Sequence, residues 1–358
     1  MERRPSLTTI VRAIAVSAAF TNLVDLASDR LGASVVTASD EFFAPKERLL
    51  KLEAAVWREG EYTDRGKWMD GWETRRRRDV MPGDPEFSRA HDWCIVHLGA
   101  RGIVRGIDVD TTHFKGNFPE WCALDACVMP GEPAAYDLAR ASWQEIVPRS
   151  PLRGDAHNLF ATPDVLGAHA SHVRLRIFPD GGVARLRVYG DVAPDWELLR
   201  RRGDVDLAAV LHGGQVVACS DMFFGSRNNL IMPGDARSMA DGWETKRRRT
   251  PGHDWTIVRL GAPGTVTRID VDTRHFKGNA PGAFSLEACA LALAPGGLGW
   301  DPAIEAEWRE LLPRTPLEAD RRQTFDVALK ASGAVTHVRF NIFPDGGVAR
   351  LRLFGRLA

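Results

Sequence analysis

The chain repeats itself, and this duplication constrains its fold more than any other feature of the sequence. IDVDTTHFKGN from Ile107 recurs as IDVDTRHFKGN from Ile269, and HVRLRIFPDGGVARLRVYG recurs as HVRFNIFPDGGVARLRLFG. DGWETRRRR from Asp70 recurs as DGWETKRRR from Asp241, and SDEFF recurs as SDMFF. All blocks keep their order, and the period is far above the roughly 50 residues of short solenoid repeats. The sequence therefore predicts two copies of one whole domain.

The 358 residues are enough for two domains of ordinary size, each with its own core. Between the copies lies DVAPDWELLRRRGD, a proline-containing and charged segment typical of a linker. We expect an N-terminal extension at 1–19, the first copy at 20–190, the linker at 191–203 and the second copy at 204–358. The apolar run from Thr8 superficially resembles a signal peptide, but Arg12 interrupts it and no small-x-small cleavage site follows.

Net charge and cysteine content bear on the partners and the compartment of the protein. Lys plus Arg and Asp plus Glu both number 47, so net charge favours neither a nucleic-acid nor a membrane partner. The basic runs Arg75–Arg78 and Arg247–Arg249 are interpreted as solvated faces or anion contacts. Five cysteines without a CxxC pair argue against a disulfide framework or a zinc site and fit a reducing compartment. We expect a cytoplasmic protein that binds neither nucleic acid nor membrane.

Short apolar alternations bounded by Gly, Pro and Asp dominate both copies and predict an all-β fold, with a jelly-roll sandwich as its form. HVRLRIF and ARLRVYG, joined by Pro-Asp-Gly-Gly, are expected to form a hairpin with one polar and one apolar face. WCIVHLG and GIVRGIDVD are interpreted as two further strands. The best helix candidates are YDLARASWQEIV and its counterpart PAIEAEWRELL.

The polar face of the expected hairpin is the first candidate for chemistry. In the first copy it carries His172, Arg174, Arg185 and Arg187, and in the second copy His337, Arg339, Arg350 and Arg352. Guanidinium groups gathered on one patch repel each other unless anions lie among them, and their planar donors match a carboxylate in bidentate fashion. The alternative is that Asp or Glu of a neighbouring strand neutralises them in a structural ion network.

The second candidate is the motif DVDTTHFKGN. Asp108 and Asp110 share one face of a strand, and His113, Lys115 and Asn117 follow in the loop; Asp272, His275, Lys277 and Asn279 are the second-copy counterparts. Asp, His and Lys together can support proton transfer, with His the natural group near neutral pH. The spacing also allows a divalent-metal site, or a loop in which Asp110 and Asn117 merely cap backbone groups.

The third candidate is the motif that contains Asp70, Trp72 and Glu73 in the first copy and Asp241, Trp243 and Glu244 in the second. A Trp beside acidic residues suits a polar pocket with one aromatic wall, although packing in the core is an alternative. The chain has no GxSxG, HExxH, P-loop or dinucleotide fingerprint. An enzyme of this sequence would therefore work without a covalent nucleophile or an organic cofactor, while a stimulatory divalent metal stays open.

Together these segments resemble the allantoicase family. The resemblance rests on LVDLASDRLGASVVTASDEFFAPKERLL, GKWMDGWETRRRR, HDWCIVHLG, IDVDTTHFKGN and FPDGGVARLRVYG, and it covers the chain from about Phe20 onwards, duplication included. It implies two galactose-binding-like jelly-roll modules, assembly into homo-oligomers, and hydrolysis of allantoate to ureidoglycolate and urea. Allantoate is a small carboxylate whose central carbon carries two ureido groups, so the arginines are candidates for its carboxylate.

The implied reaction needs general acid-base groups. We expect Asp110, His113 and Lys115, or Asp272, His275 and Lys277, to handle protons. Two alternatives stay open. A jelly roll of this type can bind sugars or other small ligands without catalysis, and the same substrate can be hydrolysed by an ammonia-releasing route that generally uses a metal cage. The sequence does not show which copy is active.

Overall fold

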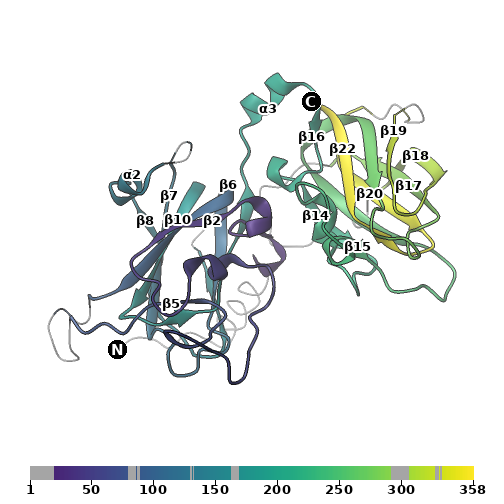
Figure 1. The fold of residues 1–358 in the computed structure, drawn as a ribbon. Coiled ribbons are helices and arrows are strands. Elements are labelled where there is room, and N and C mark those ends of the chain that lie inside the picture. Colours follow the sequence, from purple (N-terminus) through teal and green to yellow (C-terminus); the bar gives the residue numbers. More distant parts are fainter. Residues whose placement is uncertain are drawn as a thin grey trace, which may run out of the picture. The chain divides into compact units, whose positions relative to one another are not determined.

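The computed structural model describes residues 20–79, 86, 89–129, 131, 133–162, 169–291, 306–326, 330 and 333–358. Its contacts divide the chain between Ala193 and Pro194 into two compact units, and each is described here by itself (Figure 1). The expected N-terminal extension lies outside the described residues. A short helix, α3 (Trp196–Arg202), occupies most of the predicted linker.

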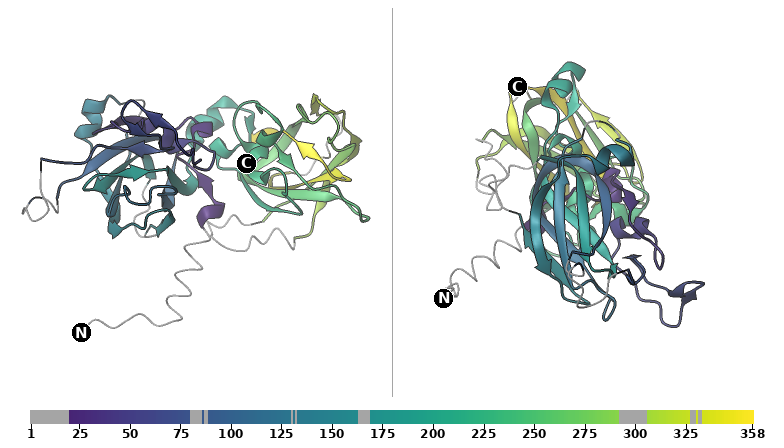
Figure 2. Two further views of the ribbon diagram at one scale, coloured as in Figure 1. Left: turned by 60° about the horizontal axis from the view of Figure 1, so that its bottom comes forward. Right: turned by 90° about the vertical axis from the view of Figure 1, so that its left-hand side faces the viewer.

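The first unit is built from antiparallel strands, which the right-hand view of Figure 2 shows side by side. They are β1 (Val24–Asp25), β2 (Ser34–Ala38), β3 (Tyr62–Thr63), β4 (Gly66–Lys67), β5 (Trp72–Glu73), β6 (Asp92–Asp110), β7 (Trp121–Cys127), β8 (Gln144–Pro151), β9 (His157–Ala161), β10 (His169–Phe178), β11 (Gly182–Val183) and β12 (Arg185–Val192). In the described residues of this unit, helical structure is limited to α2 (Ala135–Ala139) and short 3₁₀ turns at Phe20–Asn22, Asp29–Leu31 and Lys46–Leu50.

The second unit repeats this order. Its strands are β13 (Val205–Asp206), β14 (Gln215–Cys219), β15 (Trp243–Glu244), β16 (Asp254–Asp272), β17 (Ala283–Cys289), β18 (Arg309–Pro316), β19 (Arg322–Phe325), β20 (Val335–Phe343), β21 (Gly347–Val348) and β22 (Arg350–Leu357). In the described residues of this unit, 3₁₀ turns lie at Val210–His212, Arg227–Ile231 and Met239–Asp241. The strand order β13-β22-β16-β20-β17-β18 matches β1-β12-β6-β10-β7-β8 of the first unit.

One long strand organises each unit. The first half of β6 pairs with β2 and β10, and β10 continues the sheet to β7 and β8. The second half of β6 pairs with β9 and β12, and β12 pairs with β1. Register shifts interrupt both ladders, as at β-bulges, which bend a strand. A single strand therefore belongs to both sheets of the sandwich.

The core lies between the two sheets. Val173, Leu175 and Ile177 of β10 are completely buried, and so are Leu186 and Val188 of β12. The residues that alternate with them are arginines, because successive side chains of a strand point to opposite faces. The prediction of two tandem all-β sandwich domains is confirmed.

The predicted hairpin is wrong, because β10 and β12 are not neighbours. Strand β6 lies between them: Val173 pairs with Val96 in its first half, and Leu186 with Val109 in its second half. The chain between β10 and β12 instead forms β11, which pairs with β5. The two segments predicted as separate strands, WCIVHLG and GIVRGIDVD, form the single strand β6.

The predicted helices are also largely wrong. Of the predicted segment YDLARASWQEIV, only the start lies in helix α2 (Ala135–Ala139), and its end lies in strand β8 (Gln144–Pro151). Ile146 and Val147 are buried, and Val147 pairs with Leu124 of β7, so tertiary pairing overrides the helical pattern. The second counterpart begins outside the described residues and ends in strand β18, where Leu311 and Leu312 are buried.

Gly182 offers a test of this packing. A Cβ atom at Gly182 would lie 2.0 Å from the ring of Phe114, which is completely buried. We expect Gly182→Ala to lower the free energy of unfolding by about 1–3 kcal/mol through overpacking. Gly116→Ala is the matched control, because a Cβ there meets nothing within 4 Å. Calorimetric melting of both variants checks this, and equal melting temperatures would contradict the packing.

Candidate functional site

Polar side chains lie in two rows across the sheet formed by β9, β6 and β12. The register places Asp110 opposite both His157 of β9 and Arg185 of β12. Asp108, two residues earlier in β6, is opposite Arg187. Because directly paired residues project from the same face of a sheet, these five side chains share one face. The expectation that Asp108 and Asp110 share a face is confirmed.

His157 is the residue of this face that the sequence analysis missed. Its Nδ1 atom lies 2.7 Å from Asp108 Oδ2 and 4.0 Å from Asp110 Oδ1. Its side chain is 64% exposed, whereas that of Asp108 is 7% exposed. The imidazole can therefore meet a ligand while a buried carboxylate holds it. An alignment of the two copies could have identified this position. The counterpart of His157 is Arg322, which lies opposite Asp272 in the sheet as His157 lies opposite Asp110.

Burial and charge act in opposite directions on this pair. Partial burial lowers the pKa of His157, but the hydrogen bond and charge of Asp108, with the charge of Asp110, raise it above its ordinary value overall. Burial raises the pKa of Asp108, against the hydrogen bond and charge of His157. Among the described residues, Asp108 Oδ1 is buried without a hydrogen-bond partner. The arrangement stabilises the protonated form of His157.

The guanidinium nitrogens of Arg185 all have hydrogen-bond partners within the first unit. Arg185 is 1% exposed, and its guanidinium lies 2.7 Å from Asp70 Oδ2. Its other nitrogens donate to the carbonyls of Asp70, Glu53 and Ala184. The alternative interpretation, a structural ion pair, therefore fits Arg185 better than substrate binding.

Arg187 is bound less completely. One of its nitrogens donates to the carbonyls of Lys51 and Leu52, at 2.5 and 3.0 Å, and another lies 3.5 Å from Asp25. The segment 51–56 thus crosses this end of the sheet and is anchored by both arginines.

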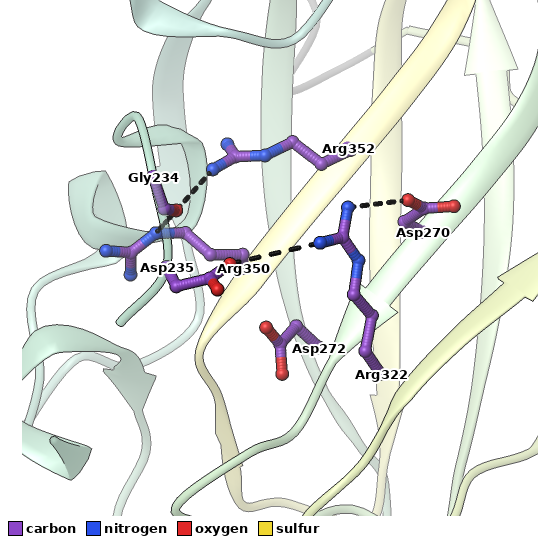
Figure 3. A pocket seen from close by; sticks show the side chains of 7 residues that line it. All are labelled: Gly234, Asp235, Asp270, Asp272, Arg322, Arg350 and Arg352. Carbon is purple, nitrogen blue, oxygen red and sulfur yellow. Dashed lines mark hydrogen bonds and ion pairs between the residues drawn. The ribbon is translucent and has the colours of Figure 1, made fainter. Parts of the chain in front are cut away.

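The second unit has a pocket at the equivalent place (Figure 3). It has a volume of about 160 Å³ and is lined by Gly234, Asp235, Asp270, Asp272, Arg322, Arg350 and Arg352. Arg322 lies 2.9 Å from Asp270 and 3.9 Å from Asp235, between the two carboxylates. Arg350 and Arg352 donate to backbone carbonyls of the 232–234 segment and also face Asp241 and Asp206. Within the described part of the chain, Arg352 Nη1 is buried without a hydrogen-bond partner.

The residues of the DVDTTHFKGN motif separate in space. His113 takes a positive φ of 70°, its backbone N–H donates to Asp155, and its Nε2 lies 3.1 Å from the carbonyl of Ala55. His275 repeats this with φ 76° and Ala236. Both histidines thus hold the segment that covers the polar face.

Lys115 and Lys277 point to solvent. Their side chains are 78% and 81% exposed and lie 3.8 and 3.9 Å from Asp155 and Asp320. Asn117 and Asn279 instead donate to Glu73 and Glu244. The structure therefore does not bring these four residues onto the face of Asp110 and Asp272.

The DGWET motif makes hydrogen bonds that attach the loops at Asp40 and Asn117, and at Asp221 and Asn279 in the second unit, to the sandwich. Trp72 is completely buried and its indole N–H donates to the carbonyl of Asp40; Trp243 repeats this with Asp221. Burial raises the pKa of Glu73, and the hydrogen bond from Asn117 opposes this rise. The expected pocket with an aromatic wall is not formed by Trp72 or Trp243, which pack in the core.

His172 and Arg174 lie on β10, which β6 separates from β12, and His337 and Arg339 lie on the equivalent strand β20 of the second unit. Arg174 is paired with Asp125 at 2.8 Å, and Arg339 with Glu287 at 2.6 Å. His172 and His337 are buried, each beside a hydroxyl group, Ser171 or Thr336. The prediction of one patch shared with Arg185 and Arg187 is wrong, because β6 lies between β10 and β12, and Arg174 and Arg185 pair with different carboxylates, Asp125 and Asp70.

In the described residues, no group of three or more His, Cys, Asp or Glu side chains is arranged to hold a metal ion. No described helix is long and apolar enough to span a bilayer. All five cysteines are free, and Cys127 and Cys289 are buried as expected for packing residues.

The Arg185–Asp70 pair gives a stability prediction. Arg185→Met leaves the carboxylate of Asp70, itself 4% exposed, with only Lys51 as a charged partner. We expect it to destabilise the first unit by about 3–5 kcal/mol, the cost of breaking a buried ion pair. Arg201→Met, which breaks an exposed pair with Glu197, is the control and is expected to change stability by less than about 1 kcal/mol. Denaturant titration measures both, and similar midpoints would contradict the structural role.

Comparison with known proteins agrees with this architecture. The allantoicase repeat model matches residues 24–193 and 205–358. A probable allantoicase of Photobacterium profundum is 49% identical over 340 residues, which cover 94% of this chain and 97% of the relative. A probable allantoicase of Pseudomonas paraeruginosa is 48% identical, with 95% and 97% covered.

A solved structure extends the comparison. The crystal structure of allantoicase from Saccharomyces cerevisiae is 32% identical, covers 99% of each chain and superposes with a TM-score of 0.77. Two matched repeats, near-complete coverage by relatives and a common fold lead to one conclusion. This chain is a member of the allantoicase family.

Proposed function

We propose that this chain hydrolyses allantoate to ureidoglycolate and urea, and that the reaction takes place on the polar face of the first unit. The reaction follows from family membership, since relatives at 48–49% identity cover almost the whole chain. The single observation that carries the location is the contact of the half-exposed His157 with the buried Asp108.

The chemistry sets clear demands on the site. The bond between the central carbon of allantoate and one ureido nitrogen breaks, and its electron pair stays on that nitrogen, which gains a proton to give urea. The remaining ureido nitrogen carries the positive charge left on carbon until water adds. The added water then loses one proton, so no net proton is consumed. One group that first donates and then accepts a proton can serve both steps.

His157 fits this role better than His113. Its imidazole is exposed, and Asp108 stabilises the protonated form that must donate to the leaving nitrogen. His113 Nε2 already contacts the carbonyl of Ala55, so we assign His113 to positioning the covering segment. Asp110, 4.0 Å from the same imidazole, is proposed to orient the water.

The remaining charges suit the rest of the substrate. Arg187 lies opposite Asp108 and is the proposed partner of the substrate carboxylate. Arg185 stays outside the proposed contacts, because Asp70 and backbone carbonyls occupy its donors. Lys115, Asn117, His172 and Arg174 are likewise left out, since the structure places them away from this face.

The first test is a product assay. Purified chain incubated with allantoate should release urea and ureidoglycolate in equal amounts. Ammonia in place of urea would favour the metal-dependent route, and the absence of any product would favour a binding module. Repeating the assay with a chelator measures any requirement for a divalent metal.

His157→Gln tests the proton carrier. We expect kcat to fall by about 10²–10⁴-fold, the range for loss of a general acid-base group, with the fold retained by circular dichroism. His91→Gln is the matched control, since His91 belongs to the first unit but lies beside Phe178, away from this face. A His157→Gln variant with wild-type kcat would remove His157 from the proposal.

Asp108→Asn tests the cause of the raised pKa of His157. Without the carboxylate, the pKa of His157 should fall. Because the protonated form is the proton donor, activity declines as pH rises through this pKa, and the alkaline limb of kcat against pH should move to lower pH. The other charged groups facing the imidazole, Asp110 and Arg187, remain in this variant. An unmoved limb would contradict the pairing.

Location in the cytoplasm and assembly into homo-oligomers also remain proposals. The free cysteines support a reducing compartment. Light scattering of the purified chain would give the number of subunits.

A further inference from the structure

We propose that the pocket of the second unit binds a small ureido acid without cleaving it. This proposal rests on the reaction proposed above, because it names the same class of ligand for a second site. The occupant is allantoate itself or a product that keeps the carboxylate and one ureido group. The pocket would make each chain bind two acids and convert one.

The geometry of the pocket supports a bound anion. Arg322, Arg350 and Arg352 line a volume of about 160 Å³. In the described structure Arg352 Nη1 is buried without a hydrogen-bond partner, although buried guanidinium nitrogens are normally satisfied. Burial also lowers the pKa of Arg352, against the charge of Asp206. A ligand carboxylate would supply the missing acceptor.

The acidic residues of the pocket fit the rest of such a ligand. Asp270 and Asp272 lie on the same strand face and accept hydrogen bonds from Arg322 and Arg274. A carboxylate keeps further acceptor positions, and ureido groups are rich in N–H donors. A mixed set of arginines and aspartates therefore matches a molecule with one carboxylate and a ureido group better than it matches a simple anion.

Asp235 occupies the place that a ligand carboxylate would take. Its side chain is 63% exposed and lies 3.9 Å from Arg322, a long contact (Figure 3). Arg274 also lies 2.8 Å from Asp235. In the first unit the corresponding position is Ala54, as the matching arginine contacts of the 53–54 and 234–235 segments show. An incoming carboxylate can displace Asp235 from Arg322 without disturbing the sheet.

The same pocket has no group suited to proton transfer. Where the first unit has His157, the second has Arg322, whose guanidinium donates hydrogen bonds but accepts none. Arg322 and Arg274 hold Asp270 and Asp272 in ion pairs. The lining of the pocket includes no imidazole that could carry a proton to a leaving nitrogen, so a bound ureido acid would persist.

The experiment uses the full chain with His157→Gln, which should consume the substrate at least about 10²-fold more slowly than the wild type. Titration calorimetry with allantoate should then give two binding events for each chain. Adding Arg322→Gln should weaken one event at least tenfold and leave the other. Adding Asp235→Asn should instead strengthen that event several-fold, because a competing carboxylate is removed. Arg321→Gln is the matched control: Arg321 is adjacent, exposed and paired with Glu318.

Each outcome separates the two proposals. One binding event that Arg322→Gln leaves unchanged would overturn the second site. Urea release by His157→Gln at the wild-type rate would overturn the location of the reaction, and the number of sites would then be measured with ureidoglycolate. Urea release that disappears with Arg322→Gln but persists with His157→Gln would place the reaction in the second unit and overturn the binding-only role.

Discussion

Strand β6, and β16 in the second unit, is the element on which the rest of each domain depends. Its first half carries one sheet and its second half the other, so the two sheets cannot form independently. The last three residues of the same strand include the two aspartates of the polar face, Asp108 and Asp110 in β6 and Asp270 and Asp272 in β16. The core and the proposed site are therefore fixed by one segment, and its bend sets the direction of Asp108 and Asp110 relative to β9 and β12.

The motifs common to both units are largely architectural. Asp70 pairs with Arg185, Glu73 accepts from Asn117, and Thr74 contacts Gly181, so the segments that recur most clearly hold the covering loops in place. Such contacts must exist in any copy that folds. The positions that differ between the units, by contrast, change the chemistry of an otherwise equivalent face.

His157 against Arg322 and Ala54 against Asp235 are the differences that matter. In the first unit, the polar face keeps a titratable group supported by a buried carboxylate. In the second, permanent charges pair with one another around a pocket. Duplication followed by such a change allows one copy to retain proton transfer while the other retains recognition. The equivalence of the faces explains why a small number of substitutions is enough.

The sequence by itself determined the duplication, the all-β class, the family and the shared face of Asp108 and Asp110, because these depend on local period and on repeated motifs. Tertiary structure alone decided which neighbours each arginine has. Alternation shows that Arg174 and Arg187 both point away from the core, but only strand order shows that β6 separates their strands. Pairing with a strand far away in sequence also brought His157 to Asp108 and turned the predicted helix at Gln144–Pro151 into β8. Long-range pairing of this kind leaves no periodic signal in the chain that it connects.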